Sequence, residues 1–370
     1  MTTILVTGSS GFIGRNLVAD LQGRADITLL RHDLGNSSAE LATALAQADI
    51  VVHLAGVNRP RNSEEFETGN TGVTREICRQ LTAIGRKTQF ILASSSQAGF
   101  DNPYGISKRR AEAEVRSYGA ESGAEVAIYR LPNVFGKFCR PNYNSAVATF
   151  CHNVAHDLDI TINDPNVEVS LVYIDDLVEE FTRALAGTPT REGAFCVVPV
   201  SYRAPLGQIV ALLQEFKRSR TELQLPDQAD AFTRKLYATY LSYLPADKLS
   251  YPLTMHVDAR GSFSEMLKTP ERGQVSVNVS KPGVIRGNHW HHTKNEKFLV
   301  VSGRGVIRVR QLGDNAVQEY AVTGETLEVV DIPPGYVHNI ENVGDTDLVT
   351  VMWANETFDP ARPDTRSEEV

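Results

Sequence analysis

The first fourteen residues, MTTILVTGSSGFIG (1–14), decide the fold of the N-terminal part of the chain. The apolar run at residues 4–6 predicts a buried strand, and glycines recur at every third position after it. A turn this tight needs residues without a Cβ, and its backbone N–H groups then face a pyrophosphate at the start of a helix. We therefore predict a dinucleotide-binding turn. The residues assigned to it are Gly8, Gly11, Phe12, Ile13 and Gly14.

Beyond this turn, short apolar runs alternate with segments of helical period up to about residue 245. Runs that predict buried strands lie at residues 27–30, 50–54, 90–92 and 126–129. A helix is predicted over 39–48, because Ser37 and Glu40 have the S-x-x-E spacing of a capping box at its start. Alternating strands and helices are typical of a parallel sheet covered on both faces. This part is therefore predicted to be α/β, a doubly wound Rossmann-type domain.

The pattern changes after a stretch with two prolines, residues 244–252. Short segments now alternate apolar and polar residues with period two, at 275–280, 307–310 and 348–353. Glycine and proline interrupt these segments, which favours an antiparallel sandwich or barrel. We predict two domains, an α/β domain over residues 1–247 and an all-β domain over residues 248–370.

Composition restricts the classes of function. The 370 residues include 45 acids and 37 bases, a net charge of −8 without a basic run, which argues against nucleic acid or an anionic membrane as the main partner. No apolar run approaches the roughly 20 residues that span a bilayer, and the N-terminus has no signal-peptide pattern. Four scattered cysteines fit reduced thiols, so we predict a soluble cytoplasmic protein.

The second strand ends in residues that bear on the choice of cofactor. Arg31 and His32 stand where an acid would bind a free ribose 2′-hydroxyl. A base at this position favours a 2′-phosphate, so NADP is predicted over NAD.

Tyr104 and Lys108, in NPYGISK, lie four residues apart after a proline, so they share one face of a helix. An ammonium near a phenol favours the phenolate and lowers the phenol's pKa. Such a phenol can exchange a proton with a substrate oxygen while hydride moves at carbon. One hydroxyl of Ser94, Ser95 and Ser96, which end the preceding strand, could orient the same oxygen. Joined to the glycine turn, these residues indicate a nicotinamide-dependent oxidoreductase.

The order of motifs TGxxGxxG, HLAG (53–56), SSS, YxxxK and RLPNVFG (130–136) resembles that of the extended short-chain dehydrogenase/reductase family, over residues 1–245. The resemblance implies that Tyr104 is the catalytic acid/base and that Lys108 tunes it and holds the nicotinamide ribose. It also implies that Ser96, or alternatively Ser95, is the third catalytic hydroxyl. Members of this family commonly act on nucleotide-linked sugars.

The same resemblance supplies candidate binding residues. It assigns Leu54, Ala55 and Gly56 to the cofactor and Asn133 to the region near the sugar and the nicotinamide. Charge and position add Arg59, Lys137, Arg140 and Asn144 as candidates for contacts with the substrate.

Two departures from the family pattern matter. Only seven residues separate Ser96 from Tyr104, which reduces the pocket lid, and the short segment after the second strand puts in doubt a complete third strand and the usual adenine-binding acid, for which Asp33 is a candidate.

A second constellation lies in the all-β part. His289 and His291, in GNHWHHTKNE, are two apart on a predicted strand and point to the same side, with Glu296 close behind and His338 further on. Three imidazoles and a carboxylate that converge would suit a divalent metal ion such as zinc, or iron, nickel or manganese.

The spacing of these residues resembles two cupin motifs, over residues 250–360. The motifs are Gly283-x5-His289-x-His291-x4-Glu296-x6-Gly303 and Pro333-x-Gly335-x2-His338-x3-Asn342. The stretches DARGSFSE (258–265) and PGVIRGNHW (282–290) are also similar to the sugar-nucleotide 3,5-epimerase branch of cupins, in which the histidine after the R-G pair is a base without metal. His289 therefore has two competing roles, and the HxH…E…H set favours the role of ligand.

The two halves have a joint chemical logic. A 4-ketone acidifies the neighbouring C3–H, so a metal could polarise the ketone while a base moves the proton from one face of C3 to the other. Reduction at C4 would then trap the new configuration. The whole layout resembles the two-domain enzymes of capsular polysaccharide biosynthesis. This resemblance implies NADPH, a zinc cupin and a homodimer, and conversion of a UDP-2-acetamido-2,6-dideoxy-4-hexulose into UDP-2-acetamido-2,6-dideoxy-L-talose, a precursor of UDP-N-acetyl-L-fucosamine.

Two alternatives stay open. The cupin part could be purely structural or dimerising beside an NADPH-dependent 4-ketoreductase, since fold does not fix function. The chain could also sense NADP without catalysis, against which the intact pair of Tyr104 and Lys108 argues. The base of the cupin is left undefined among Lys281, Lys297, His256, His292 and Tyr336.

Overall fold

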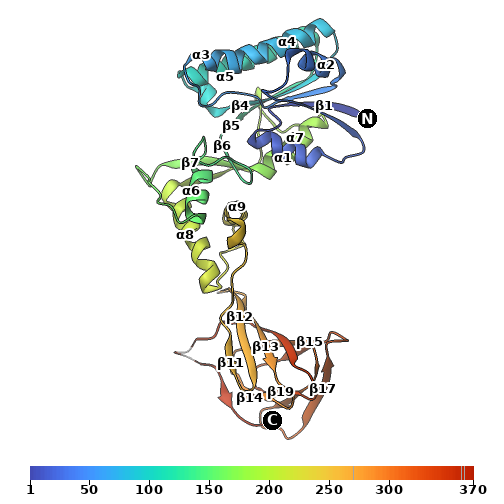
Figure 1. Ribbon diagram of the computed structural model, residues 1–370, viewed down its shortest axis with the longest axis vertical. Helices are drawn as coiled ribbons and strands as arrows, with labels where there is room; N and C mark the ends of the chain where they lie inside the picture. The colour runs from blue at the N-terminus through green and yellow to red at the C-terminus, as the bar shows by residue number, and fades with distance from the viewer. Residues whose placement is uncertain (270, 360, 362) are drawn as a thin grey trace. The chain divides into compact units, whose positions relative to one another are not determined.

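The computed structural model describes residues 1–269, 271–359, 361 and 363–370. The chain divides into two compact units (Figure 1). The first unit comprises Met1–Gln214 and Asp230–Pro245, and the second comprises Glu215–Ala229 and Ala246–Val370.

The first unit is built on a seven-stranded sheet in the order β2-β1-β3-β4-β5-β9-β8. Its strands are β1 (Thr2–Thr7), β2 (Ile27–His32), β3 (Ile50–His53), β4 (Gln89–Ser95), β5 (Val126–Leu131), β8 (Arg191–Glu192) and β9 (Phe195–Cys196). All neighbours from β2 to β9 pair in parallel, and only the last pair, β8 and β9, is antiparallel. The predicted α/β class and the five predicted strands are confirmed.

The sequence put in doubt a complete strand beyond β2, between β2 and β3 in the chain. Strand β2 pairs only with β1 and forms the edge of the sheet, and helix α2 (Ser38–Gln47) leads directly from β2 toward β3. The Ser37 side chain accepts the Glu40 N–H and the Glu40 carboxylate accepts the Ser37 N–H, so the predicted capping box is confirmed. The segment between β2 and β3 forms this capped helix, and no third strand lies beyond β2 among the described residues.

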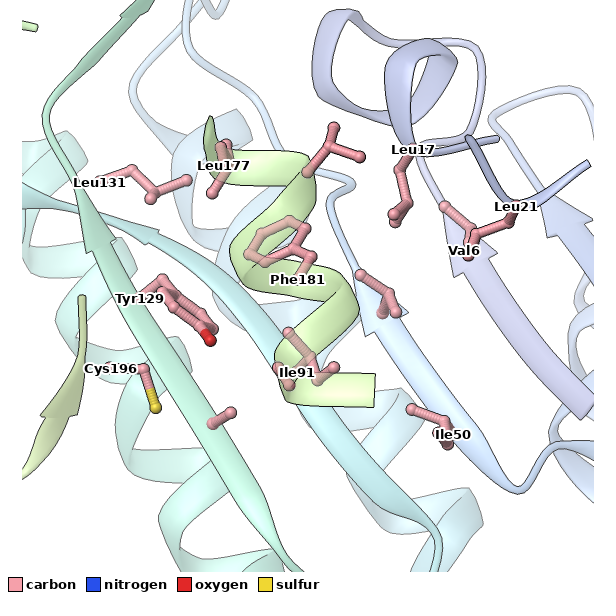
Figure 2. Close-up of a cluster of buried hydrophobic side chains, with 14 of the residues drawn as sticks. Val6, Leu17, Leu21, Ile50, Ile91, Tyr129, Leu131, Leu177, Phe181 and Cys196 are labelled. Atoms are coloured by element: carbon pink, nitrogen blue, oxygen red, sulfur yellow. The ribbon is translucent and has the colours of Figure 1, made fainter. Parts of the chain in front are cut away.

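Helices cover both faces of the sheet, because successive residues of each strand point to opposite sides. Ile4 and Val6 of β1 face one core with α1 (Phe12–Leu21) and α7 (Ile174–Leu185), whereas Leu5 faces the other. Figure 2 shows the first core, in which the ring of Phe181 on α7 meets Tyr129 on β5 with their centroids 5.1 Å apart. The opposite core contains α2, α4 (Val73–Ile84) and α5 (Pro103–Ser122).

The remaining elements of the first unit extend beyond the carboxyl ends of the strands. A small sheet has the order β10-β7-β6. The elements are α3 (Glu64–Phe66), η1 (Glu67–Gly72), η2 (Ser96–Gly99), β6 (Asn133–Phe135), α6 (Ala146–Ala155), β7 (Glu168–Tyr173), β10 (Tyr202–Pro205) and α9 (Ala231–Leu241). Helix α8 (Leu206–Glu222) begins in this unit, and its residues from Glu215 on belong to the second unit.

The C-terminal stretch of the second unit, Ala246–Val370, forms two antiparallel sheets, in the orders β11-β12-β13-β20-β15-β18 and β17-β16-β19-β14-β21. After the short helix η3 (Ala246–Lys248) the strands are β11 (His256–Asp258), β12 (Gly261–Thr269), β13 (Gly273–Ser280), β14 (Ile285–Trp290), β15 (Glu296–Ser302), β16 (Arg304–Gln311), β17 (Val317–Thr323), β18 (Val329–Ile332), β19 (Tyr336–Asn342), β20 (Leu348–Ala354) and β21 (Arg366–Ser367). One apolar core joins the sheets, with Phe298 and Leu348 from the first and Ile307 and Ile340 from the second. The all-β prediction is confirmed as a sandwich consistent with a cupin.

Within the described part of the chain, no helix is both long and apolar enough to cross a membrane.

Candidate functional site

The glycine turn after β1 is built so that larger residues do not fit. Gly8 has a φ of +73°, and a Cβ there would lie 2.7 Å from the backbone nitrogen of Ala55. A Cβ on Gly14 would lie 2.2 Å from the carbonyl oxygen of Gly8. The turn therefore packs against itself and against the loop after β3, and helix α1 starts directly behind it.

This turn forms one wall of a cavity of about 1130 Å³ in the first unit. The predicted residues that line it are Gly8, Gly11, Phe12, Ile13, Gly14, Leu54, Gly56, Ser94, Ser95, Ser96, Tyr104, Lys108, Asn133, Arg140 and Asn144. Three predicted cofactor residues, Arg31, His32 and Ala55, and the predicted substrate residue Arg59 are not among the described residues of its lining. The structure thus brings the glycine turn and the tyrosine–lysine pair to one cavity.

Helix α5 presents Tyr104 and Lys108 to this cavity. Its start is fixed by Asn102, whose side chain accepts the Gly105 N–H, and by Pro103 in the first turn. Burial raises the pKa of Tyr104, and a hydrogen bond with the Ser95 hydroxyl opposes this only in part. The sequence predicted a lowered pKa from the lysine, and that prediction is wrong for this structure, because burial disfavours the phenolate more than its surroundings favour it.

Lys108 is held in a polar frame. It is 7% exposed, and its ammonium donates to the Ala93 carbonyl over 2.8 Å. Burial lowers its pKa to about 8. The side chain of Asn70 joins the loop after β3 to α5, since it bonds both Val57 backbone groups and the Ser107 hydroxyl.

The three serines at the end of β4 have different surroundings. Ser94 is buried and donates to Glu112 over 2.6 Å, so its hydroxyl is part of the protein's internal structure. Ser96 is exposed. Ser95 is the serine that contacts the Tyr104 hydroxyl. Sequence reasoning preferred Ser96, and only the path of the chain after β4 distinguishes the three.

Arg31 and Asp33, which lie at the end of β2 and just after it, have different partners. The guanidinium of Arg31 is exposed and donates to Gln22 over 3.1 Å. Asp33 is bound to the glycine turn, since it accepts the Ser9 hydroxyl at 2.6 Å and the Ser10 N–H at 3.0 Å. The hydrogen bonds from these two serines lower the pKa of Asp33 although burial opposes them. Asp33 therefore supports the turn.

The opposite end of the cavity carries aromatic and cationic side chains. Tyr143 lines it, and the guanidinium carbons of Arg59 and Arg140 lie 5.9 and 5.5 Å from the centre of its ring. Lys137 forms an ion pair with Asp175 and is not part of the described lining. Tyr143 was missed by the sequence analysis, because a single exposed aromatic residue gives no local signal.

The four predicted metal ligands meet in the second unit. Their ligand atoms all lie within 4.8 Å of one another. His289 and His338 are opposite each other on β14 and β19, His291 follows β14, and Glu296 begins β15 of the other sheet. The Glu296 carboxylate lies 3.4 Å from Nε2 of His291 and 3.1 Å from Nε2 of His338.

The donor set of this cluster fits a divalent metal ion. His291 and His338 are 3% and 0% exposed, and their Nε2 atoms and the Glu296 Oε2 are buried without a hydrogen-bond partner of good geometry. Burial, helped by the two neighbouring imidazoles, lowers the pKa of His289 to about 4. Burial opposes ionisation of Glu296, but His291 and His338 lower its pKa. A neutral imidazole and an ionised carboxylate are the forms that bind metal.

The cluster lies in a cavity of about 400 Å³. None of the five proposed cupin bases is among the described residues of its lining. Lys281 and Lys297 are instead paired with Asp347 and Asp331, and His256 and His292 are exposed. Proton-carrying or charged side chains that do line it, and that the sequence analysis missed, are Glu265, Arg286, Lys294 and Glu356. The residues adjacent to these four in the sequence did not indicate that their side chains face the cavity.

A glycine turn at the carboxyl edge of a parallel sheet, next to a tyrosine–lysine pair on a helix, defines the class of nucleotide-dependent enzymes with a Rossmann-type fold. Residues 4–193 match the NAD dependent epimerase/dehydratase family, and residues 256–366 match the polysaccharide biosynthesis C-terminal domain. The chain belongs to the NAD dependent epimerase/dehydratase family.

Its relatives include proteins that are similar over the full length. A UDP-2-acetamido-2,6-beta-L-arabino-hexul-4-ose reductase of Pseudomonas aeruginosa is 45% identical over 98% of this chain and 97% of the relative. The crystal structure of the capsular polysaccharide assembling protein CapF from Staphylococcus aureus has a TM-score of 0.94 and 54% identity, covering 99% of this chain and 100% of that one. A structure of CapF with the inhibitor 3-isopropenyl-tropolone has a TM-score of 0.89 and 50% identity over both whole chains. The resemblance to two-domain capsular enzymes is confirmed.

Proposed function

We propose that the chain is a bifunctional nucleotide-sugar enzyme of capsular polysaccharide biosynthesis. The second unit epimerises C3 of a UDP-2-acetamido-2,6-dideoxy-4-hexulose, and the first reduces the C4 ketone with NADPH to UDP-2-acetamido-2,6-dideoxy-L-talose. The observation that supports the proposal is that one chain brings together two groups of side chains, the Ser95–Tyr104–Lys108 set and the His–His–Glu–His cluster. We assign the two activities to domains at 1–247 and 248–370.

The reductase step follows from the contacts of the larger cavity. When bound, NADPH supplies the hydride that C4 accepts. Tyr104 donates its phenolic proton to the ketone oxygen, and its raised pKa keeps that proton in place at neutral pH. Ser95 orients the same oxygen, because its hydroxyl already contacts Tyr104. Lys108 holds the ribose from its position beside the loop after β3.

We propose NADPH over NADH because of Arg31 at the end of β2. Its guanidinium is exposed and carries only one hydrogen bond to a neutral side chain, so it is available to a 2′-phosphate. Arg31→Ala should raise the KM for NADPH about tenfold, as loss of one charge-assisted contact, and leave that for NADH unchanged. Equal effects on both cofactors would contradict this role.

The proposed epimerase step uses a bound metal ion and two proton carriers. We propose that His289, His291, Glu296 and His338 hold a divalent ion, of which zinc fits best, and that it supplies Lewis-acid stabilisation of the negative charge on the substrate oxygen. This arrangement assigns His289 to the metal and leaves the proton transfer to other residues of the cavity.

We assign that proton transfer to Glu356 and Lys294. Glu265, the other carboxylate of the cavity outside the cluster, is paired with Lys268 at 2.6 Å. Lys294 is 8% exposed, and among the described residues the Glu356 carboxylate has two long contacts, both to the Thr293 hydroxyl at 3.4 and 3.5 Å. Glu356 takes the C3 proton while the C–H electrons delocalise onto the ketone oxygen, and the Lys294 ammonium returns a proton to the opposite face.

We also propose a cytoplasmic homodimer. The homodimer rests on the resemblance to the capsular enzymes, and the location on four cysteines that are free thiols, as expected in a reducing compartment.

A second candidate is favoured by one observation, the name of the Pseudomonas aeruginosa relative, which is that of a reductase alone. In this version the second unit is structural or dimerising, and the chain is only an NADPH-dependent nucleotide-sugar 4-ketoreductase.

Proton NMR in D2O separates the two candidates. The purified chain is mixed with the UDP-linked 4-keto sugar in the absence of NADPH, and deuterium at C3 is followed with time. Exchange at C3 that continues in Tyr104→Phe and stops in His338→Ala supports an epimerase in the second unit. NADPH oxidation on that substrate without any C3 exchange would leave the reductase alone.

The variants of the assigned residues extend this experiment. Lys294→Met and Glu356→Gln should each slow epimerisation at least about a hundredfold, the usual contribution of a positioned acid or base. Lys297→Met, which changes an exposed lysine of β15 that is paired with Asp331, is the matched control and should react like the wild type.

A further inference from the structure

The segment 364–368, here called the C-terminal strap, runs along the edge of the second sheet of the second unit. Its strand β21 pairs with β14, placing Ser367 opposite His289 and Arg366 opposite Trp290. The Glu368 N–H donates to the Asn288 carbonyl over 3.0 Å. The strap is therefore the outermost strand beside the one that carries His289.

The strap is also anchored by a side chain from another strand. Arg310 on β16, which is 14% exposed in its side chain, donates to the Glu368 carboxylate at 2.8 Å and to the Glu369 carbonyl at 2.7 Å. A guanidinium that is largely buried and bonded to both a side chain and the backbone fixes the strap in position along its length.

Asp364 binds the loop that follows His289. One carboxylate oxygen accepts the His292 N–H at 3.0 Å. The other accepts the Thr293 N–H at 2.8 Å, the Thr293 hydroxyl at 3.0 Å and the Lys294 N–H at 3.1 Å. Three successive backbone N–H groups thus converge on one carboxylate, an arrangement that holds the loop to the strap.

The backbone of Asp364 contacts the metal cluster directly. Its carbonyl oxygen is hydrogen-bonded to Nδ1 of His291. A carbonyl can only accept, so Nδ1 must carry the proton, and the neutral imidazole then has its lone pair on Nε2. Nε2 is the atom that faces Glu296 at 3.4 Å. The strap therefore selects the tautomer that binds metal and fixes the direction of the ring.

We propose that the C-terminal strap, through Asp364, is the support that positions His291 as a metal ligand. The inference rests on the proposed metal centre and adds a residue outside both cupin motifs. Groups that hydrogen-bond the second nitrogen of a metal-binding histidine commonly change metal affinity when removed. The same carboxylate also positions Lys294, the proposed proton donor, through its backbone N–H.

Zinc affinity of the full chain tests this proposal. Asp364→Ala removes all four contacts of the carboxylate, and we expect zinc to bind about tenfold to a hundredfold more weakly, measured by competition with a chromophoric chelator. Glu369→Ala is the matched control, because it removes the same charge from the residue that follows the strap and its side chain is exposed. Its affinity should stay at the wild-type value.

Two further measurements separate positioning from general destabilisation. Thermal unfolding of the metal-free variants shows whether Asp364→Ala is still folded, and Asp364→Asn, which keeps the shape and one acceptor oxygen, should lose less affinity than the alanine variant. The visible absorption of bound Co²⁺ reports ligand geometry in whatever fraction is folded. We expect a weaker or shifted band for Asp364→Ala and an unchanged band for Glu369→Ala.

The outcomes distinguish the two proposals. Wild-type chain that binds zinc while Asp364→Ala binds it equally well, with the same Co²⁺ spectrum, overturns the role of the strap and leaves the metal centre intact. Wild-type chain that binds no zinc and no Co²⁺ overturns the metal centre itself.

Discussion

The two cavities of this protein differ in whether their polar groups already have hydrogen-bond partners within the protein. The larger one is lined by glycines, backbone groups and hydroxyls, and the Lys108 ammonium that lines it already donates to the Ala93 carbonyl. In the smaller one the buried ligand atoms of His291, Glu296 and His338 have no hydrogen-bond partner of good geometry.

From this difference we infer which of the two sites needs its ligand for stability. A site whose polar groups are satisfied internally keeps its geometry before a cofactor arrives. A cluster of buried, unsatisfied nitrogen and oxygen atoms is costly on its own and gains stability from a cation, by mass action on the folded state. We therefore expect NADPH to bind a preformed cradle, and a metal ion to complete the second unit.

The largest effect should come from adding a side chain in the glycine turn, which should weaken NADPH binding. Gly14→Ala places a Cβ 2.2 Å from the Gly8 carbonyl, a contact with backbone that no side-chain movement relieves. We expect NADPH affinity, measured by fluorescence titration, to fall more than about a hundredfold, since backbone shifts of this kind cost several kcal/mol. Gly35→Ala is the control, because nothing lies within 4 Å of the added atom. Normal NADPH binding by Gly14→Ala would contradict the described turn.

The next effect tests the dependence of the second site on its ion. His338→Ala should weaken zinc binding more than about a hundredfold, and added zinc should no longer raise the unfolding temperature of the second unit. The exposed His256 offers a control, as His256→Ala should bind zinc normally. NADPH affinity should be unchanged in both variants. If zinc stabilises His338→Ala as much as the wild type, the cluster is not the metal site.

The serine comparison should give a smaller difference. Ser95→Ala removes the hydroxyl that contacts Tyr104, and we expect kcat/KM for ketone reduction to fall about tenfold to a hundredfold, the value of one hydrogen bond to a group of developing charge. Ser96→Ala should stay within about threefold of the wild type, because this side chain is exposed and leaves no buried partner unsatisfied. The reverse order would restore the original assignment of Ser96.

The smallest effect concerns pH. Burial lowers the pKa of Lys108 to about 8, so the ammonium is present below this pH and is lost as the pH rises through it. Tyr104, with a raised pKa, keeps its proton over the same range. We expect kcat/KM for reduction to decline above about pH 8, from loss of the cation. Lys108→Arg should move the decline to higher pH, and an identical profile in that variant would assign the titration to another group.

Much of the fold could be predicted because its signals are local. The strand before Gly8, the alternation of runs up to residue 245 and the period-two pattern after 252 each reflect neighbouring residues that share one face of an element. The capping box of Ser37 and Glu40 depends on three residues of separation. The missing third strand could be suspected from a short segment, although its replacement by a capped helix required the structure.

The sites divide in the same way. A glycine turn, a Tyr–Lys pair and an HxH…E…H set can be recognised without a structure, because each motif is defined by fixed spacing along the chain. Four contacts could be found only in the folded chain: Ser95 beside Tyr104, Asp33 bonded to the glycine turn, Lys294 and Glu356 in the lining of the metal cavity, and Asp364 bonded to His291 across 73 residues. Short spacing fixes which side chains share a face, whereas contacts between distant segments depend on how strands pair and loops close, and no local pattern encodes them.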